Sequence, residues 1–152
     1  MNFSDEQIEE AIKAFYSPGV TNQHPDCIRI AIEWLSAQHY IEGRGRKRFA
    51  LKHLIENWAG RYVSWCDVHV AAKLLGLEGE YPHYGLSARL ILPKLDRLDN
   101  IGEAFKHRYK CNLGDYKITE LGTTIKRELK RFGDPRDVKK ITFLDEFNPY
   151  KP

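Results

Sequence analysis

Residues that end helices divide this chain into short segments, and they constrain its fold more than any other feature of the sequence. Runs of helically spaced apolar residues stop at Pro18, Gly43, Gly60 and Gly76. Proline disfavours helix in the residue before it, and glycine readily adopts the positive φ that terminates a helix. The sequence therefore predicts several short helices that pack against one another, and its 42% of apolar residues is enough to build a common core.

Capping residues locate the starts of the expected helices. Ser4 with Gln7, and Ser64 with Asp67, have the spacing of a capping box, in which the two side chains bond to backbone amides at the start of a helix. Apolar residues then recur at helical spacing in four segments. The resulting expected helices follow Ser4, follow Asn22, and cover 46–59 and 64–76.

The C-terminal half is expected to mix loops, a hairpin and helices. The stretch 77–86 is rich in glycine, proline and tyrosine and should be a loop. A helix is expected over 87–101, and it either bends at Pro93 or begins there, because proline is tolerated only in a first turn. Turn residues between two extended stretches predict a β-hairpin over 104–119, and helical spacing resumes over 120–132.

These elements define a fold that is mainly α with a small β-hairpin. A length of 152 residues favours one compact unit. Within that unit we expect an N-terminal helical pair over 1–42, a body over 43–133 and a C-terminal tail over 134–152. The helical pair is short and amphipathic, so it should pack on the body.

The hydropathy pattern argues against a membrane protein. No apolar run approaches the roughly 18 residues that a bilayer span requires. The first ten residues are acidic, whereas the start of a signal peptide is basic. We therefore expect a soluble, cytoplasmic protein without a membrane partner.

The cysteines give no sign of a metal or redox site. Cys27, Cys66 and Cys111 lie far apart in sequence, and no CxxC pair is present. Three free thiols are ordinary in a reducing cytosol, where cysteine often serves as a small core residue. We expect neither a metal nor another cofactor.

Catalytic motifs are also missing from the sequence. The six histidines form neither HxxxH nor HxH, and there is neither a glycine-rich phosphate loop nor a GxSxG sequence. Asp99, Glu103 and His107 would share one face of a continuous helix, but Gly102 and the expected hairpin argue against that helix. The sequence therefore predicts a protein that is not an enzyme.

Charge is unevenly distributed along the chain, although the net charge is only +3. Residues 1–33 hold two basic and six acidic side chains, a net charge of −4, whereas residues 44–140 hold 21 basic and 12 acidic ones, a net charge of +9. A positive body behind an acidic first segment suits a polyanion, or a partner that contacts both signs. Uneven charge is also common on soluble proteins, so this pattern leaves that alternative open.

Two stretches resemble parts of the winged helix-turn-helix family. Residues 63–68, Val-Ser-Trp-Cys-Asp-Val, and the apolar residues that follow up to Gly76 are similar to its supporting helix. Residues 116–122, Tyr-Lys-Ile-Thr-Glu-Leu-Gly, are similar to the junction between strand and helix that closes a wing. In that family a third helix enters the DNA major groove and the hairpin lies over the phosphate backbone. The resemblance thus implies a winged-helix-like body over 43–133.

The function implied by this resemblance is that of a bacterial transcriptional regulator that binds double-stranded DNA, and such regulators commonly form homodimers. Arginine is the commonest partner of guanine because its planar fork donates twice. The expected base-reading residues are Arg89, Lys94 and Arg97. The expected phosphate contacts are Arg46, Lys47 and Arg48 in a basic run, and Lys106, Arg108 and Lys110 in the hairpin. Pairing with acidic neighbours is the alternative for Arg89 and Arg97.

A protein-binding role on the same scaffold is the other interpretation. The long connection over 77–86 and Pro93 both depart from the family pattern, and either would mean that the DNA-reading role is lost. Exposed aromatic residues are typical anchors of protein interfaces. The candidate aromatics are Trp34, Trp58, Trp65, Tyr81, Tyr84, Phe143, Phe147 and Tyr150, and the tryptophans alternatively complete the core. The chain also resembles small accessory or inhibitory proteins of phages, plasmids and conjugative elements, in its size and in residues 27–38.

One geometric feature separates the two interpretations. Arg89, Lys94, Arg97 and the hairpin lysines should converge on one surface if the protein reads DNA. Acidic residues within that surface would instead favour the protein-binding role.

Overall fold

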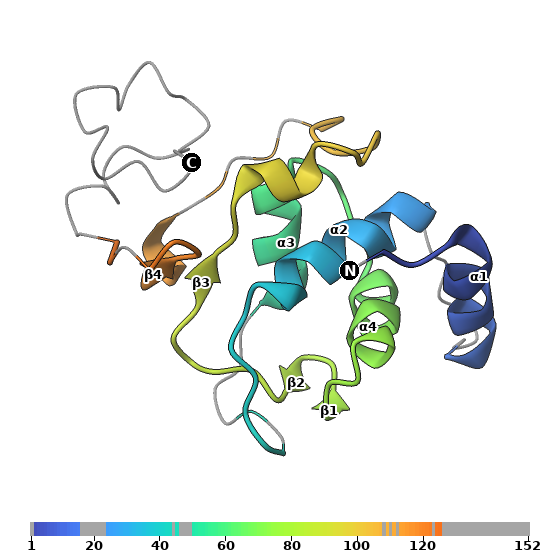
Figure 1. The fold of residues 1–152 in the computed structure, drawn as a ribbon, viewed down its shortest axis with the longest axis horizontal. Helices are drawn as coiled ribbons and strands as arrows, with labels where there is room; N and C mark the ends of the chain where they lie inside the picture. The colour runs from blue at the N-terminus through green and yellow to red at the C-terminus, as the bar shows by residue number, and fades with distance from the viewer. Residues whose placement is uncertain are drawn as a thin grey trace.

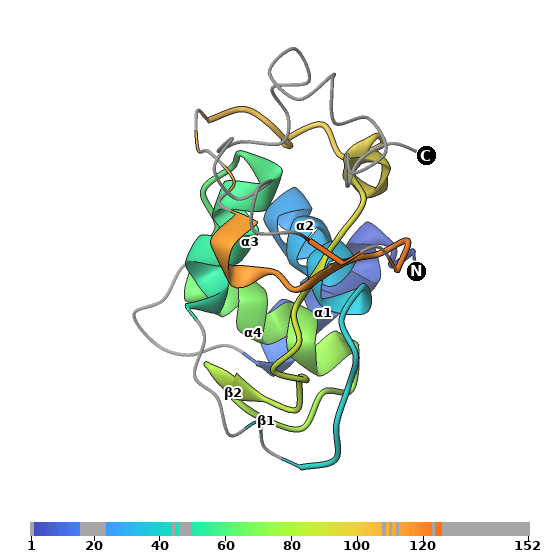
Figure 2. The same ribbon diagram turned by 90° about the vertical axis from the view of Figure 1, so that its left-hand side faces the viewer.

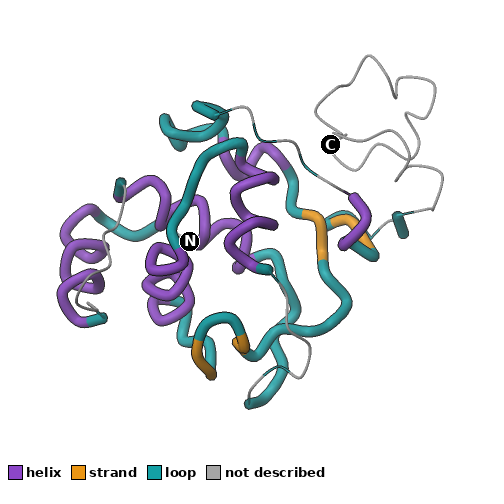
Figure 3. The backbone as a smooth tube through the Cα atoms, turned by 180° about the vertical axis from the view of Figure 1, so that it is seen from behind, coloured by secondary structure: helices purple, strands orange, loops and turns teal. Residues whose placement is uncertain are grey.

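The computed structural model describes residues 2–15, 24–43, 45, 50–107, 109, 111, 113–122 and 124–125. Within these residues, four short helices pack together and two small pairs of strands lie at separate places (Figures 1 and 3). The helices are α1 (Asp5–Ala14), α2 (Pro25–Ser36), α3 (Leu51–Ala59) and α4 (Trp65–Leu74). The strands are β1 (Gly79–Glu80), β2 (His83–Tyr84), β3 (Ile91–Leu92) and β4 (Ile118–Thr119), with short 3-10 helices η1 (Leu95–Leu98) and η2 (Leu113–Asp115).

The starts and ends of the helices follow the local sequence signals. Both expected capping boxes are present: the Gln7 amide donates to Ser4 Oγ and the Asp67 amide donates to Ser64 Oγ, each at 3.1 Å. Gly60 ends α3 with a φ of 63°, a conformation that glycine adopts without strain. The four helices predicted in the first half of the chain are therefore present, but two of their bounds differ from the prediction. The second helix, expected to reach Gly43, ends at Ser36, and the third, expected over 46–59, begins at Leu51.

The core is centred on α2, which packs along α4 in the most extensive contact between two elements. Figure 2 shows α2, α3 and α4 as one group, with α1 against α2 and α4. Trp34 and Trp58 are fully buried in this core, whereas Trp65 is 38% exposed. The helical pair and the body therefore share one core, which extends from Ile8 to Ile125.

The β1–β2 hairpin lies at one end of the helix group, below α4 in Figure 2. Its strands are antiparallel, with Gly79 opposite Tyr84. The chain after α2 runs along the hairpin: the Ile41 amide donates to the Gly85 carbonyl at 2.9 Å, and the Gly45 amide donates to the Tyr84 carbonyl at 3.1 Å. The stretch 77–86, expected to be a loop, thus contains a hairpin.

The helix expected over 87–101 is wrong. Irregular chain over 87–90 leads into β3, which pairs in parallel with β4, and η1 follows after Pro93 and Lys94. Leu90, Ile91 and Leu92 are all buried, so this apolar run is a buried strand, and Pro93 follows it where the strand pairing ends. The side-chain amide of Gln38 bonds to both the N–H and the carbonyl of Ile91, and so completes the hydrogen bonding on the other edge of β3.

The hairpin expected over 104–119 is also wrong within the described residues. Turns follow η1, and their backbone bonds to the end of α3: Phe105 donates to the Ala59 carbonyl and His107 to the Gly60 carbonyl, each at 2.8 Å. Residues 118–119 pair with β3 instead of folding back on 104–111. The helix expected over 120–132 does not begin at its first residue, because a turn occupies 120–121. Residues 126–132 and the tail over 134–152 lie outside the described residues.

No helix in the described part of the chain combines the length and the apolar character that a bilayer crossing requires.

Candidate nucleic-acid interface

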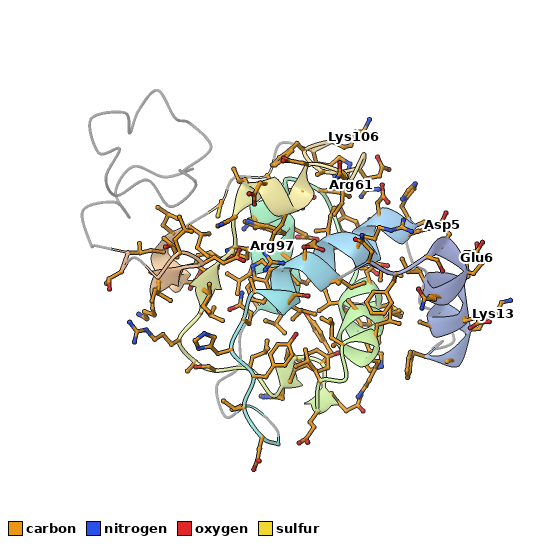
Figure 4. All side chains as sticks on the ribbon, viewed as in Figure 1. Asp5, Glu6, Lys13, Arg61, Arg97 and Lys106 are labelled. Atoms are coloured by element: carbon orange, nitrogen blue, oxygen red, sulfur yellow. The ribbon has the colours of Figure 1, made fainter. Side chains whose placement is uncertain are left out.

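The guanidinium of Arg97, an expected base-reading residue, forms hydrogen bonds with two carboxylates of the protein itself. Its Nε and Nη2 donate to the Glu120 carboxylate at 2.8 and 2.6 Å, and its Nη1 donates to Glu33 at 2.9 Å. All three guanidinium nitrogens therefore already donate to carboxylates, and the side chain is only 23% exposed. Figure 4 shows Arg97 beside α2 and within the outline of the protein. Arg97 thus joins the chain after β4 to α2.

The Glu120 carboxylate is the centre of this connection. It also accepts a hydrogen bond from the Lys94 backbone amide at 2.9 Å. Burial tends to raise the pKa of Glu120, but the hydrogen bonds from Arg97 and from the Lys94 amide outweigh burial and lower its pKa. The hydrogen bond to Glu120 raises the pKa of Arg97. Both groups are therefore charged at neutral pH.

The three expected base readers do not lie on one helix. Arg89 is exposed in the irregular chain before β3, and Lys94 is half-buried between β3 and η1. Acidic residues stand among them, because Glu33 and Glu120 both bond to Arg97. The helix that would have presented these side chains to the major groove is absent from 87–101.

The expected phosphate contacts are divided between described and undescribed residues. Lys106 is exposed, and it lies at the end of the molecule opposite the β1–β2 hairpin (Figures 1 and 4). The others, Arg46, Lys47, Arg48, Arg108 and Lys110, lie outside the described residues.

The described residues on either side of the basic run Arg46–Arg48 contact the hairpin on one side and begin α3 on the other. The Gly43 amide donates to the Glu78 carboxylate at 2.6 Å, and the Gly45 amide donates to the Tyr84 carbonyl. A Cβ on Gly45 would collide with that carbonyl oxygen, so only glycine fits there. On the other side, Ala50 is the N-cap residue of α3, and its side chain makes no capping hydrogen bond. The described residues that flank the run therefore lie at the β1–β2 hairpin and at the amino end of α3.

A chain of aromatic rings, here called the aromatic face, connects α4 with the same hairpin. The ring of Trp65 lies 6.0 Å from that of Tyr81 and 6.4 Å from that of His69. The His69 ring lies 6.3 Å from that of Tyr84 and 6.1 Å from that of Phe15 at the end of α1. The Tyr81 hydroxyl accepts a hydrogen bond from the Lys52 amide at 3.3 Å. The aromatic face thus reaches the first turn of α3, directly after the basic run.

This juxtaposition is not evident from the sequence. The sequence suggests Trp65, Tyr81 and Tyr84 as anchors for a protein partner, with Trp65 alternatively a core residue, and gives no link between them and the basic run. Trp65 and His69, four residues apart on one helix, are a local signal for a shared face. The contact with Tyr81 depends on the hairpin, which the sequence analysis placed elsewhere.

His69 and Lys73 attach the hairpin to α4. The His69 Nδ1 lies 2.8 Å from the Tyr84 hydroxyl, and Lys73 Nζ donates to the Gly79 carbonyl at 2.8 Å. Burial lowers the pKa of His69, and Lys73 lowers it further, against the opposite effect of Glu80. Burial also raises the pKa of the Tyr84 phenol far above its usual value. Both rings are therefore held in their neutral forms at neutral pH.

Lowering the pH should reduce stability through His69. Its pKa lies below 6.5 in the folded protein, so the unfolded chain takes up the proton at a higher pH. The contribution of neutral His69 to the free energy of unfolding is fully present above pH 6.5. It is lost as the pH falls towards the folded pKa, and the free energy of unfolding then decreases by at most about 1.4 kcal/mol per pH unit. Urea denaturation between about pH 5 and 8 should give a smaller pH slope for His69→Gln than for the wild type. Identical slopes would contradict a neutral, buried His69.

Two buried cysteines among the described residues have thiols with raised pKa values. Burial raises the pKa of Cys27 to about 12 and also raises the pKa of Cys66, so both thiols stay protonated and weakly nucleophilic at neutral pH. A cavity of about 400 Å³ lies between the N-terminus, α2 and η1, and Arg29 and Arg97 line it. Arg29 is paired with Asp5 and Asp26, so carboxylates offset both cations. Within the described residues, no group of three or more His, Cys, Asp or Glu side chains is arranged to hold a metal ion.

Comparison with known proteins gives no significant match to a family model, to a curated sequence or to a solved structure.

Proposed function

We propose that this protein is a non-catalytic DNA-binding protein of the winged-helix type, which contacts the phosphate backbone through its basic run. One observation carries this proposal: α2, α3 and α4 are followed by the antiparallel β1–β2 hairpin, the order of three helices and a wing. The match begins one helix earlier than the sequence resemblance implied. The wing is then 79–84, and α4 takes the place of the third helix.

The described residues just before the basic run support the same proposal. Gly43 and Gly45 are bonded to the hairpin, and the run that follows leads into α3. A wing lies over the phosphate backbone in this family. The basic run directly follows residues that are bonded to the hairpin, so its cations are the proposed phosphate contacts, and such contacts supply most of the affinity in non-specific DNA binding.

Base reading contributes little in this proposal. The guanidinium of Arg97 is occupied by two carboxylates. The exposed side of α4 presents Trp65 and the partly covered His69 and Lys73, without an arginine. The protein should therefore bind duplexes with low sequence preference and a strong dependence on salt. The homodimer implied by the family resemblance stays a prediction.

Replacing Arg46, Lys47 and Arg48 together by alanine should weaken duplex binding and flatten its salt dependence. Each phosphate contact contributes roughly 0.9 to the slope of log affinity against log salt, so the slope should fall by about 2–3. Fluorescence anisotropy with a labelled random duplex, between roughly 50 and 200 mM salt, measures this slope.

A control removes exposed cations elsewhere. Lys13 lies on α1 and Lys117 just before β4, and both are exposed, so their double alanine variant should keep the wild-type slope. A slope that falls in this control but not in the basic-run variant would move the interface away from the hairpin. Wild-type protein that fails to bind duplex at the lowest salt would refute the proposal.

A protein-binding role is the second candidate, and the acidic neighbours of Arg97 favour it. Glu33 and Glu120 stand where a base-reading surface would need free cations. The exposed Trp65 is also of the residue type that anchors protein interfaces. This candidate takes precedence if the duplex experiment gives no binding.

A further inference from the structure

We propose that the cavity between the residues before α1, α2 and η1 binds a small α-amino acid with an apolar side chain. Its volume of about 400 Å³ lies within the range of protein pockets that enclose small molecules. The cavity contains neither the basic run nor the aromatic face, so it is a site independent of the proposed function.

One part of the cavity lining is apolar. Ile32 on α2 is fully buried, and Phe3 before α1 and Ile101 after η1 are partly buried against the same core. An apolar ligand side chain placed against these residues would be removed from water, which favours binding through the hydrophobic effect.

The other part of the lining carries charges of both signs. Arg29 and Glu33 are one turn apart on α2, so they share a face of the helix. Arg97 of η1 lies beside them, with its Nη1 2.9 Å from Glu33 Oε1. Figure 4 shows Arg97 beside the C-terminal half of α2 and Asp5 beside its start. Cationic and anionic groups are thus combined in one small cavity.

These charged groups are held in place and still have capacity for further hydrogen bonds. Arg29 donates from Nη1 to Asp26 at 2.9 Å and from Nη2 to Asp5, and a guanidinium has five N–H donors in all. Glu33 accepts from Arg97 through Oε1, and a carboxylate has about four acceptor sites. A ligand carboxylate can therefore bind at Arg29 and a ligand ammonium at Glu33. The spacing of one helical turn suits the neighbouring charges of an α-amino acid.

The charge around the cavity favours a zwitterion over a simple ion. Among the described residues, the two guanidiniums bond to the four carboxylates of Asp5, Asp26, Glu33 and Glu120, a net charge of −2. This excess of carboxylates would repel a simple anion. A simple amine would lie beside two guanidiniums without bringing a group that binds them. A ligand that carries both charges and no net charge avoids both conflicts.

Isothermal titration calorimetry with L-leucine tests the assignment. Isoamylamine lacks the carboxylate of leucine, isocaproate lacks its ammonium and glycine lacks its side chain. Leucine should bind about 10-fold more tightly than each of these three compounds, because each compound lacks one of the proposed contacts. Equal affinity for leucine and isocaproate would overturn the zwitterion site. If neither L-leucine nor L-phenylalanine bound, the cavity would have no amino-acid ligand and the proposal would be wrong.

Variants locate the bound leucine. Glu33→Gln keeps the shape of the side chain, removes its charge and should weaken leucine binding about 10-fold. Because Glu33 also bonds to Arg97, a second variant leaves that ion pair intact. Asn100 is exposed and lines the cavity, so Asn100→Trp should block the cavity and abolish binding. Glu10→Trp adds the same side chain at an exposed position of α1 and is the matched control.

The results for these variants have distinct meanings. Loss of leucine binding in Asn100→Trp, with wild-type affinity in Glu10→Trp, would support the cavity as the binding site. Wild-type affinity in Asn100→Trp would place the leucine elsewhere on the protein and overturn the proposal. Equal losses in both tryptophan variants would overturn it as well. Each of these outcomes leaves the proposed function unaffected, because duplex affinity is measured in a separate experiment.

Discussion

Replacing Trp34 by alanine is expected to lower the free energy of unfolding by about 3–5 kcal/mol, the range typical for a large aromatic residue removed from a core. Trp34 lies on α2, is fully buried, and donates from Nε1 to the Tyr116 hydroxyl at 2.9 Å. Its loss would leave a cavity and would remove the contact between α2 and the chain before β4. Urea denaturation measures the change directly.

Two conservative variants divide this effect into packing and hydrogen bonding. Tyr116→Phe removes only the hydroxyl, and leaves the buried indole N–H without its acceptor at a cost of about 1–3 kcal/mol. Trp34→Phe keeps most of the ring and should cost less than Trp34→Ala. If Trp34→Ala lowered the free energy of unfolding by less than about 1 kcal/mol, this tryptophan would not be part of the core.

The first half of the fold was predictable because its signals are local. A capping box spans four residues, and both Ser4 and Ser64 form one in the structure. Gly60 ends its helix through its own conformational freedom, and needs no distant partner. Helices with such boundaries can be located from the sequence alone, although the ends of α2 and α3 differ by several residues from those expected.

The β3–β4 pair in the second half was not predictable in the same way, because its two strands lie far apart in sequence. Ile91 pairs with Ile118, and Gln38 bonds to the other edge of the same strand. The run from Leu90 to Leu92 fits a buried strand as well as a buried helix, and periodicity alone does not separate the two for so short a run. The partner strand decides between them, and a single sequence gives no sign of it.

The candidate site was likewise predictable only in its local features. The basic run is plain in the sequence, and Trp65 follows a capping residue that the sequence also places. Their connection is made by Tyr81, whose position depends on where the hairpin forms. Arg97 was predicted to contact DNA because a single sequence reveals its charge but not its partners. In the structure it bonds to Glu33 and Glu120, which are 64 and 23 residues away in the chain.

Arg97→Ala should destabilise the protein by about 2–3 kcal/mol and leave duplex affinity unchanged. Removing one partner of a buried ion pair costs about 3–5 kcal/mol, and the value here is smaller because these side chains are about one-fifth exposed. Urea denaturation and duplex anisotropy measure the two quantities. The double variant Arg97→Ala with Glu120→Gln should recover part of the stability, because it removes one of the two stranded carboxylates.

The pH dependence of the same pair gives an independent check. The pKa of Glu120 is lowered below 4.5 in the folded protein, so its contribution to stability is present above pH 4.5 and is lost as the pH falls through the folded pKa. The difference between wild type and Arg97→Ala should therefore shrink in acid, because the wild type loses an interaction that the variant lacks. A constant difference down to about pH 3 would mean that the pair does not stabilise the fold through charge. If Arg97→Ala left the free energy of unfolding unchanged but lowered duplex affinity, Arg97 would belong to the DNA interface. Only a direct contact between Arg97 and the duplex would then explain the loss of affinity.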